Sequence, residues 1–534
     1  MGELRLEGRP ASPGFAAGML QVLGRPASAR QPGDRFGQDA EVLRGAIAAG
    51  IRNLEALAAG LDGEAAEMIG FQIAMLEDPA LSEAAFEAVA GGSAATDAWT
   101  AAMNAEIAGY GASDDEYFRA RAGDLADIRD RVLVGLGGEA TPSIRPGAIV
   151  VAADLAPSLL LSTDWSGGAI ALRHGSATSH VAMLARSRGI PMVVGLGDAP
   201  ATNLLDGTPV LLEGDAGLLV VDPTDAARRA FDLRRGQRAT EGEAARAGRT
   251  QPARMADGTP VTVLLNIADP AELAGLDPEL CDGIGLVRTE LLFEGSAPPG
   301  EDAQIAVYRG ILRWASGRPV TIRTLDAGGD KPIAGVTLDH ETNPFLGVRG
   351  VRLSLRHLPM FKLQLRALAR AAAEGPLEIM VPMVSVPVEI GQVRVLLDEV
   401  CRELAAEGLS HRRPPLGIMV EVPAVAIAPE RFDADFYSIG SNDLVQYTLA
   451  AGRDAAALAD LARPTDPSVL RLIANVAAHG ARTNRKVSLC GDAGGSPAAI
   501  PHLLGAGLRI LSMAPSDVGE AKRAIAGYQP GSLP

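Results

Sequence analysis

Residues 416–423 read LGIMVEVP, a short apolar run that ends at a carboxylate, Glu421. Its length and composition are typical of a β-strand. Seven similar runs occur after residue 255, with helical stretches between them: VTVLLNI (261–267), GIGLVRTE (283–290), VTIRTLD (320–326), LEIMVPM (377–383), DFYSIGSND (435–443), KVSLCGD (486–492) and LRILSMAP (508–515). Eight strands alternating with helices predict a (β/α)8 barrel over residues 251–534, and a doubly wound open sheet is the alternative.

Charged and polar residues gather where these predicted strands end. In a barrel the C-terminal strand ends meet on one face, where active sites of this fold form. Arginine side chains suit phosphate or carboxylate oxygens, carboxylates are ligands for Mg²⁺, and a cysteine can act as an acid or base. Structural roles for the arginines and for a buried cysteine are the alternatives. The residues concerned are Arg288, Arg323, Glu421, Asn442, Asp443 and Cys490.

A second informative stretch, ATSHVAMLARSRGIP, spans residues 177–191. Thr178 and Ser179 are good N-cap types and Gly189 is a helix-ending residue, which predicts a helix with His180 in its first turn. The free N–H groups and the positive end of the helix dipole favour an anion there. A histidine that carries a phosphoryl group would suit this position, and a surface or capping histidine is the alternative.

The N-terminal half divides into three further regions. The β-type runs GAIVVA, GAIAL, IPMVVG, PVLLEG and GLLVVD surround the His180 helix and predict a small α/β domain of residues 1–37 and 138–223. Apolar residues at helical spacing without a strand signal predict a helical domain at 38–137. The polar, alanine-containing segment 224–250 predicts a solvent-exposed linker helix.

Composition excludes several classes of protein. The chain has 534 residues, 47% hydrophobic and 21% charged, which indicates a soluble protein of several domains. A net charge of −16 argues against nucleic acid or an anionic membrane as the main partner. Three widely spaced cysteines indicate neither a disulfide framework nor a zinc site, and with no apolar signal or spanning segment we expect a cytoplasmic protein. A P-loop ATP site is absent from the sequence.

Several of these stretches closely resemble the enzyme I family of the bacterial phosphotransferase system. The resemblance rests on ATSHVAMLARSRGIPMVVG, GIGLVRTELLF, IRTLDAGGDK, NPFLGVRGVR, GIMVEVPA, SIGSNDLVQYTLAAGRD and LCGDAGG. Pyruvate phosphate dikinase and phosphoenolpyruvate synthase share the barrel motifs but carry an additional ATP-grasp domain, so the helical region at 38–137 favours enzyme I. The resemblance implies a multidomain α/β fold: a swivelling phosphohistidine α/β domain with an inserted helical, carrier-binding domain, followed by a (β/α)8 barrel.

The resemblance also implies a role for each matching residue. His180 falls on the histidine that is phosphorylated by phosphoenolpyruvate, Cys490 on the proton donor, and Glu421 and Asp443 on the Mg²⁺ ligands. The substrate-binding positions are Arg288, Arg323, Arg349, Asn442 and Arg453. Two departures from the family pattern are HGSA at 174–177 and Asp492 in place of the usual glutamate after Cys490-Gly491.

The implied activity is the first step of the phosphotransferase system. The phosphoryl group of phosphoenolpyruvate would move to His180 and then to a histidine-containing phosphocarrier protein of the HPr type, with release of pyruvate. Family members dimerise through the barrel, and neither nucleic acid nor membrane is expected as a partner. A carbon–carbon lyase of the phosphoenolpyruvate/pyruvate barrel class and a non-catalytic phosphoenolpyruvate sensor are the two alternatives.

Overall fold

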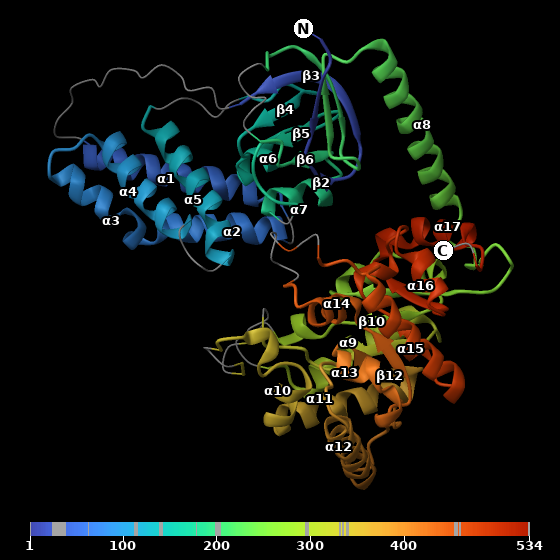
Figure 1. Cartoon of the computed structure of the whole chain (residues 1–534). Coiled ribbons are helices and arrows are strands. Elements are labelled where there is room, and N and C mark those ends of the chain that lie inside the picture. The colour runs from blue at the N-terminus through green and yellow to red at the C-terminus, as the bar shows by residue number, and fades with distance from the viewer. Residues whose placement is uncertain are drawn as a thin grey trace. The chain divides into compact units, whose positions relative to one another are not determined.

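The computed structural model describes residues 2–23, 39–61, 64–111, 116–137, 143–177, 179–197, 204–293, 298–329, 333, 336–337, 341–452, 458 and 461–531. For His180 only the backbone is described. The chain forms two compact units, Met1–Gly236 and Gln237–Pro534 (Figure 1). Each unit has hydrophobic cores of its own.

The second unit contains a closed barrel of eight parallel strands. In chain order they are β9 (Thr262–Ile267), β10 (Ile284–Val287), β11 (Val320–Arg323), β12 (Leu377–Val381), β13 (Leu416–Val420), β14 (Tyr437–Ile439), β15 (Val487–Leu489) and β16 (Ile510–Met513). Neighbours in the sequence are neighbours in the barrel, and β16 pairs with β9 to close it. Each strand lies within one of the eight apolar runs. The barrel prediction is therefore confirmed and the open-sheet alternative is wrong.

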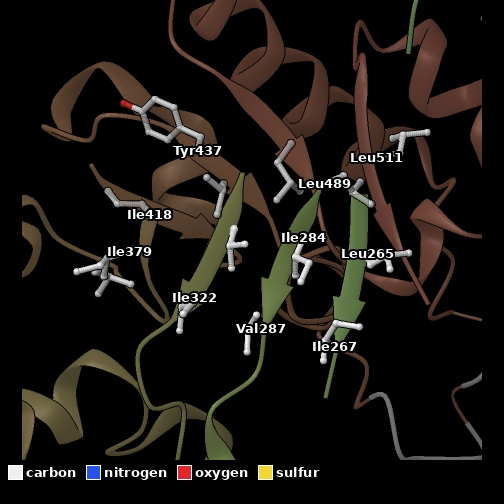
Figure 2. Packing of buried hydrophobic residues seen from close by; sticks show 14 of the residues in the cluster. Leu265, Ile267, Ile284, Val287, Ile322, Ile379, Ile418, Tyr437, Leu489 and Leu511 are labelled. Carbon is white, nitrogen blue, oxygen red and sulfur yellow. The ribbon is translucent and has the colours of Figure 1, made fainter. Parts of the chain in front are cut away.

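Alternate residues of the barrel strands pack on opposite sides, which explains why the runs are apolar throughout. Ile379, Ile418 and Leu489 belong to the large core shared with the covering helices (Figure 2). Met419 and Cys490 belong to a smaller cluster inside the barrel. The helices of this unit include α9 (Glu301–Ala315), α10 (Val351–Arg356), α11 (Leu358–Ala371), α12 (Pro387–Ala406), α13 (Pro423–Ile427), α14 (Ser441–Leu449), α15 (Pro467–Thr483), α16 (Ile500–Gly505) and α17 (Val518–Gly527).

The first unit is built on an eight-stranded mixed sheet of order β1-β8-β7-β3-β4-β5-β6-β2. Its strands are β1 (Leu4–Glu7), β2 (Arg9–Ser12), β3 (Phe15–Val22), β4 (Ile149–Ala152), β5 (Ala169–Leu172), β6 (Met192–Val194), β7 (Pro209–Glu213) and β8 (Leu218–Val221). Strands β3 to β6 are parallel and the other pairings are antiparallel. The strands β4 to β8 coincide with the five runs that predicted this α/β region. Helices α6 (Pro157–Ser162) and α7 (His180–Ser187) lie in its connections.

Between β3 and β4 the described chain is helical. It forms α1 (Asp39–Ala58), α2 (Glu64–Glu77), α3 (Pro79–Ala90), α4 (Ala95–Gly111) and α5 (Glu116–Gly135). Asp127 of α5 ties this block to α6, because its carboxylate accepts hydrogen bonds from the Ser158 hydroxyl at 2.7 Å and from the Ser158 N–H at 3.1 Å. None of the helices in the described ranges is long and apolar enough to cross a membrane.

The polar segment after β8 forms one long helix, α8 (Asp225–Ala247), whose two ends pack on different units. Phe231 is buried in the first unit and makes an edge contact with Phe15, with ring centroids 5.4 Å apart. Arg234 forms an ion pair with Glu213 in the same unit. Farther along, Arg238 pairs with Glu520 of the second unit at 3.3 Å. The predicted linker segment is therefore a helix that packs on the first unit through Phe231 and Arg234 and on the second unit through Arg238.

We predict that Phe231→Ala destabilises the first unit and leaves the barrel unchanged. Removal of a buried phenyl ring costs roughly 3–5 kcal/mol, because the hydrophobic contact is lost and a cavity remains. Leu233→Ala is the matched control, since Leu233 lies on the same helix but is 64% exposed. Amide hydrogen exchange of β3, β7 and β8 in the full chain would accelerate only in Phe231→Ala. Equal exchange in the two variants would contradict this account of how α8 is anchored.

Candidate active site

A cavity of about 580 Å³ lies at the C-terminal ends of the barrel strands. Because all eight strands are parallel, residues that follow different strands reach the same rim of the barrel. Six of the residues predicted from the sequence line this cavity: Arg288, Arg323, Glu421, Asn442, Asp443 and Cys490. Arg349 lies beside the lining and contacts Asp443, whereas Arg453 lies outside the described residues.

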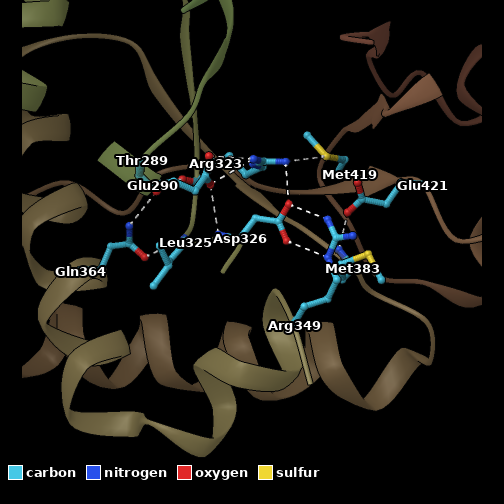
Figure 3. A network of polar contacts seen from close by, with 10 residues as sticks. All are labelled: Thr289, Glu290, Arg323, Leu325, Asp326, Arg349, Gln364, Met383, Met419 and Glu421. Carbon is cyan, nitrogen blue, oxygen red and sulfur yellow. Dashed lines mark hydrogen bonds and ion pairs between the residues drawn. The ribbon is translucent and has the colours of Figure 1, made fainter. Parts of the chain in front are cut away.

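A buried network of ion pairs supports one side of the cavity (Figure 3). Asp326 lies between two guanidinium groups, with its Oδ2 atom 3.0 Å from Arg323 Nη1 and 3.0 Å from Arg349 Nη2. Arg323 also donates to both Glu290 oxygens, at 3.0 and 3.1 Å. Arg349 Nη1 lies 3.4 Å from Asp443 Oδ1. The network therefore joins residues from four different segments of the chain.

The carboxylates of this network offset the cost of burying the charged side chains of Arg323 and Arg349. Burial alone would lower the pKa of Arg323, but Glu290 and Asp326 raise it above its usual value. The same holds for Arg349, which is only 1% exposed and whose pKa Asp326 and Asp443 raise. Both side chains are therefore fixed cations. Within the described part of the chain the buried Nε–H group of Arg323 has no hydrogen-bond partner.

Glu421 is a buried carboxylate of the rim. It is 1% exposed, and its Oε1 atom accepts a hydrogen bond from the Met383 N–H at 2.5 Å. Burial, followed by the negative charges of Asp326 and Asp443, raises the pKa of Glu421 to about 8. Arg323 and Arg349 oppose this rise, and a further cation nearby would also stabilise the ionised form of Glu421.

The hydrogen bond to Glu421 depends on an unusual backbone conformation. Met383 has φ = 57°, a region that residues other than glycine rarely adopt. Gly350, with φ = 58°, leaves the space next to it, because a Cβ atom on Gly350 would lie 2.8 Å from the Met383 Cβ. A strained residue at a binding site is a frequent feature of functional sites. Here it directs one N–H group at the predicted metal ligand.

The predicted metal ligands fit a divalent cation by their chemistry. Glu421 and Asp443 are hard oxygen donors that line one cavity, and burial, followed by the charges of Asp326 and Asp443, raises the pKa of Glu421. Among the described residues no group of three or more histidine, cysteine, aspartate or glutamate side chains is placed to hold a metal ion. Two carboxylates would leave most of the coordination positions of Mg²⁺ to water or to substrate oxygens.

Helix α14 brings further polar groups to the cavity. Asn442 and Asp492 form a reciprocal pair: the Asn442 amide donates to Asp492 Oδ2 at 2.9 Å, and the Asp492 N–H donates to Asn442 Oδ1 at 3.1 Å. The Ser441 hydroxyl lines the cavity, is buried and has no partner among the described residues. Gly440 provides no side chain to cap α14. The uncapped N–H groups and the positive end of the helix dipole would therefore favour an anion at this helix start.

Cys490 lies at the floor of the cavity, in the apolar cluster inside the barrel. Its thiol donates to the Ile439 carbonyl at 3.6 Å. Burial raises the pKa of Cys490 to about 11. The thiol is therefore protonated at neutral pH, which suits a proton donor better than a thiolate nucleophile.

His180 belongs to the first unit, where the predicted helix start is confirmed. Helix α7 begins at His180, and the Ser179 hydroxyl caps it by accepting from the Ala182 N–H at 3.3 Å. The helix ends at Ser187, and Gly189 follows with φ = 65°, as expected for a helix-terminating glycine. Thr178, the other predicted capping residue, lies outside the described residues.

Three residues of the site received no role in the sequence analysis. Asp326 and Glu290 were visible there only as polar residues at strand ends, and their pairing with Arg323 depends on the tertiary structure. Met383 gave no signal at all, because a positive φ at a residue other than glycine cannot be read from composition.

Comparison with known proteins gives a consistent result over most of the chain. Residues 7–121, 144–217 and 242–529 match the N-terminal, mobile and phosphoenolpyruvate-binding domains of the phosphoenolpyruvate-utilising enzymes. A phosphoenolpyruvate-protein phosphotransferase of Bacillus sp. (strain S) is 35% identical over 97% of this chain and 92% of its own length. The one from Cupriavidus necator is 36% identical, over 97% of this chain and 94% of its own.

A longer relative also matches. The multiphosphoryl transfer protein of Rhodobacter capsulatus is 39% identical over 82% of this chain, and the match spans 53% of that protein. The three matched domains, and two relatives aligned over nearly their whole length, agree with each other. This chain belongs to the phosphoenolpyruvate–protein phosphotransferases, within the family of phosphoenolpyruvate-utilising enzymes.

Proposed function

We propose that this chain moves the phosphoryl group of phosphoenolpyruvate to its own His180 and then to a histidine-containing phosphocarrier protein of the HPr type, with release of pyruvate. This is the first step of the phosphotransferase system. The observation that carries the proposal is the cavity at the barrel rim, where Arg323, Glu421 and Cys490 converge. The described cysteines are unpaired, which supports the cytoplasmic location inferred from the sequence.

Substrate binding follows from the fixed charges of the cavity. Arg288 and Arg323 bind the phosphoryl group, whose developing charge their planar donors match. Arg349, which lies beside the cavity lining, supports the site through its ion pairs, which hold Asp326 and Asp443 in place. The Asn442 amide, oriented by Asp492, donates to the substrate. The resemblance assigns a further substrate contact to Arg453.

A Mg²⁺ ion held by Glu421 and Asp443 would supply positive charge for the phosphate and carboxylate oxygens of the substrate. The two side chains contribute what the cation needs from the protein, namely two carboxylates in a buried setting. Their other neighbours restrict them: Glu421 is held by the Met383 N–H, and Asp443 by Arg349.

The chemistry then requires one nucleophile and one acid. An imidazole nitrogen of neutral His180 attacks the phosphorus, the bond from phosphorus to the enol oxygen breaks, and the enolate of pyruvate leaves. The Cys490 thiol, protonated at neutral pH because it is buried, gives its proton to the methylene carbon of the enolate. Protonation at carbon yields pyruvate and makes the transfer strongly favourable.

The helical block carries the charge expected of a carrier-binding surface. Residues 39–137 contain 18 acidic and 6 basic residues, so most of the net charge of the chain lies in this segment. An acidic surface attracts a basic partner and speeds its association. We therefore infer that the phosphocarrier presents a basic surface to α1–α5.

We also propose that the chain forms a homodimer through its barrel. A surface groove of about 600 Å³ between α10 and α12 is lined by apolar residues that include Leu358, Val388 and Val395. Val388 and Val395 are 60% and 62% exposed on the same helix. An exposed apolar surface of this kind is typical of a protein–protein contact, and a second copy of the barrel is the occupant that the family resemblance implies.

We predict that His180→Ala abolishes labelling of the full chain by [³²P]phosphoenolpyruvate, because no other residue is proposed to accept the phosphoryl group. His174→Ala is the matched control, since His174 is an exposed histidine of the preceding loop, and it should be labelled normally. The measurement is the stoichiometry of acid-labile label per chain. Normal labelling of His180→Ala would refute the shuttle role, and an unlabelled parent protein would favour the lyase or the sensor.

We predict that Glu421→Gln greatly weakens the dependence of labelling on Mg²⁺, because one ligand charge is lost. The Mg²⁺ concentration for half-maximal labelling should rise by about 100-fold or more. Asp433→Asn, which changes an exposed carboxylate of the same barrel, should leave it unchanged. Identical Mg²⁺ titrations for Glu421→Gln and the parent would exclude Glu421 as a ligand.

We predict that the two units separate the two half-reactions. A protein of residues 1–240 retains Phe231 and Arg234 and should accept label from a phosphorylated carrier, but not from phosphoenolpyruvate, whose proposed site lies in the other unit. Residues 252–534 should bind phosphoenolpyruvate and dimerise without being labelled. Protein-bound label and sedimentation velocity measure these outcomes. Direct labelling of the N-terminal piece by phosphoenolpyruvate would overturn this division of labour.

A further inference from the structure

Two buried serines lie next to Cys490 inside the barrel, and the proposed function gives neither of them a role. Ser438 is the middle residue of β14 and Ser488 the middle residue of β15, and the two are direct partners in the register of these strands. Their chain neighbours Tyr437 and Leu489 belong to the outer core (Figure 2). The serines therefore point the other way, into the barrel, as Cys490 does.

The geometry of these serines places a hydroxyl beside the sulfur. The Ser488 hydroxyl donates to Ser438 Oγ at 3.1 Å. Ser438 directly precedes Ile439, the residue whose carbonyl the Cys490 thiol contacts, and its side chain lies on the same inner face of the barrel as the sulfur. The thiol directs its own proton at the Ile439 carbonyl. Since Ser438 Oγ already accepts from Ser488, its single proton is free to point at the sulfur.

The surroundings of the sulfur show why such a donor matters. Burial is the largest influence on the Cys490 thiol and opposes its ionisation. Glu421 also opposes ionisation, whereas Arg323 and Arg288 favour it from across the cavity. A hydrogen bond from Ser438 to the sulfur would act in the same direction as the arginines. A buried thiolate receives no hydrogen bonds from water. A hydrogen-bond donor of the protein replaces one of them and so lowers the free energy of the thiolate.

We propose that Ser438 and Ser488 are positioning residues for Cys490: Ser488 orients the Ser438 hydroxyl, which donates a hydrogen bond to the sulfur and stabilises the thiolate left after proton transfer. In that step the S–H bond breaks and a C–H bond forms at the methylene carbon of the enolate. The electron pair stays on sulfur, and a proton from solvent later restores the thiol. The inference rests on the proposed role of Cys490 as proton donor.

The test measures the thiol of the full chain directly. The carboxamidomethylation rate of Cys490 by iodoacetamide is followed by peptide mass spectrometry from pH 7.5 to 9.5. Because only the thiolate reacts, we expect Ser438→Ala to react roughly 10- to 100-fold more slowly at each pH, the range for loss of one hydrogen bond to a charged group. Ser488→Ala should show a smaller decrease, and Ser438→Thr, which keeps the hydroxyl, should restore the rate.

The control is Ser354→Ala, which removes another buried hydroxyl, on α10, and should leave the rate unchanged. Exchange of [¹⁴C]pyruvate into phosphoenolpyruvate should slow in Ser438→Ala while the final labelling of His180 stays complete. Equal alkylation rates in Ser438→Ala and the parent would overturn the inference. Failure of the parent to be labelled at His180 would instead overturn the proposed function, and the alkylation result would still decide whether Ser438 acts on the thiol.

Discussion

The shared carboxylate of Asp326, placed between the guanidinium groups of Arg323 and Arg349, is the interaction on which the rim of the barrel depends. All three side chains are buried, and a buried charge that loses its partner costs several kcal/mol. The segments after β11 and before α10 must therefore lie against each other. Gly350 makes this approach possible, because a Cβ atom there would also come within 3.3 Å of Asp326.

The same burial sets the chemistry of the cavity. Arg349 reaches past Asp326 to Asp443, and Glu421 lies near both carboxylates, so acidic groups are concentrated where a divalent cation is proposed. Cys490, at the floor of the same cavity, is kept protonated by its apolar surroundings. One physical condition, the burial of these two side chains, thus gives a carboxylate that favours a cation and a thiol that can act as an acid.

The separation into two units gives the proposed shuttle its structural basis. His180 starts α7 in the first unit, and the cavity lies in the second. Helix α8 spans the boundary between them, with Phe231 packed in the first unit and Arg238 paired in the second.

The sequence by itself determined the elements whose signals are local. Eight apolar runs predicted eight strands, polar residues at their ends predicted the rim of the cavity, and Ser179 with Gly189 predicted the helix that begins at His180. The motif resemblance, from which the roles of Arg349 and Arg453 were inferred, is likewise a property of contiguous stretches. Only the tertiary structure decided that Arg349 pairs with Asp443, 94 residues away, and that Ser438 and Ser488 meet beside Cys490. It also decided that Met383 adopts a positive φ to hold Glu421. These features depend on which strands are neighbours and on backbone conformations imposed by packing, and neither is encoded in the residues nearby in sequence.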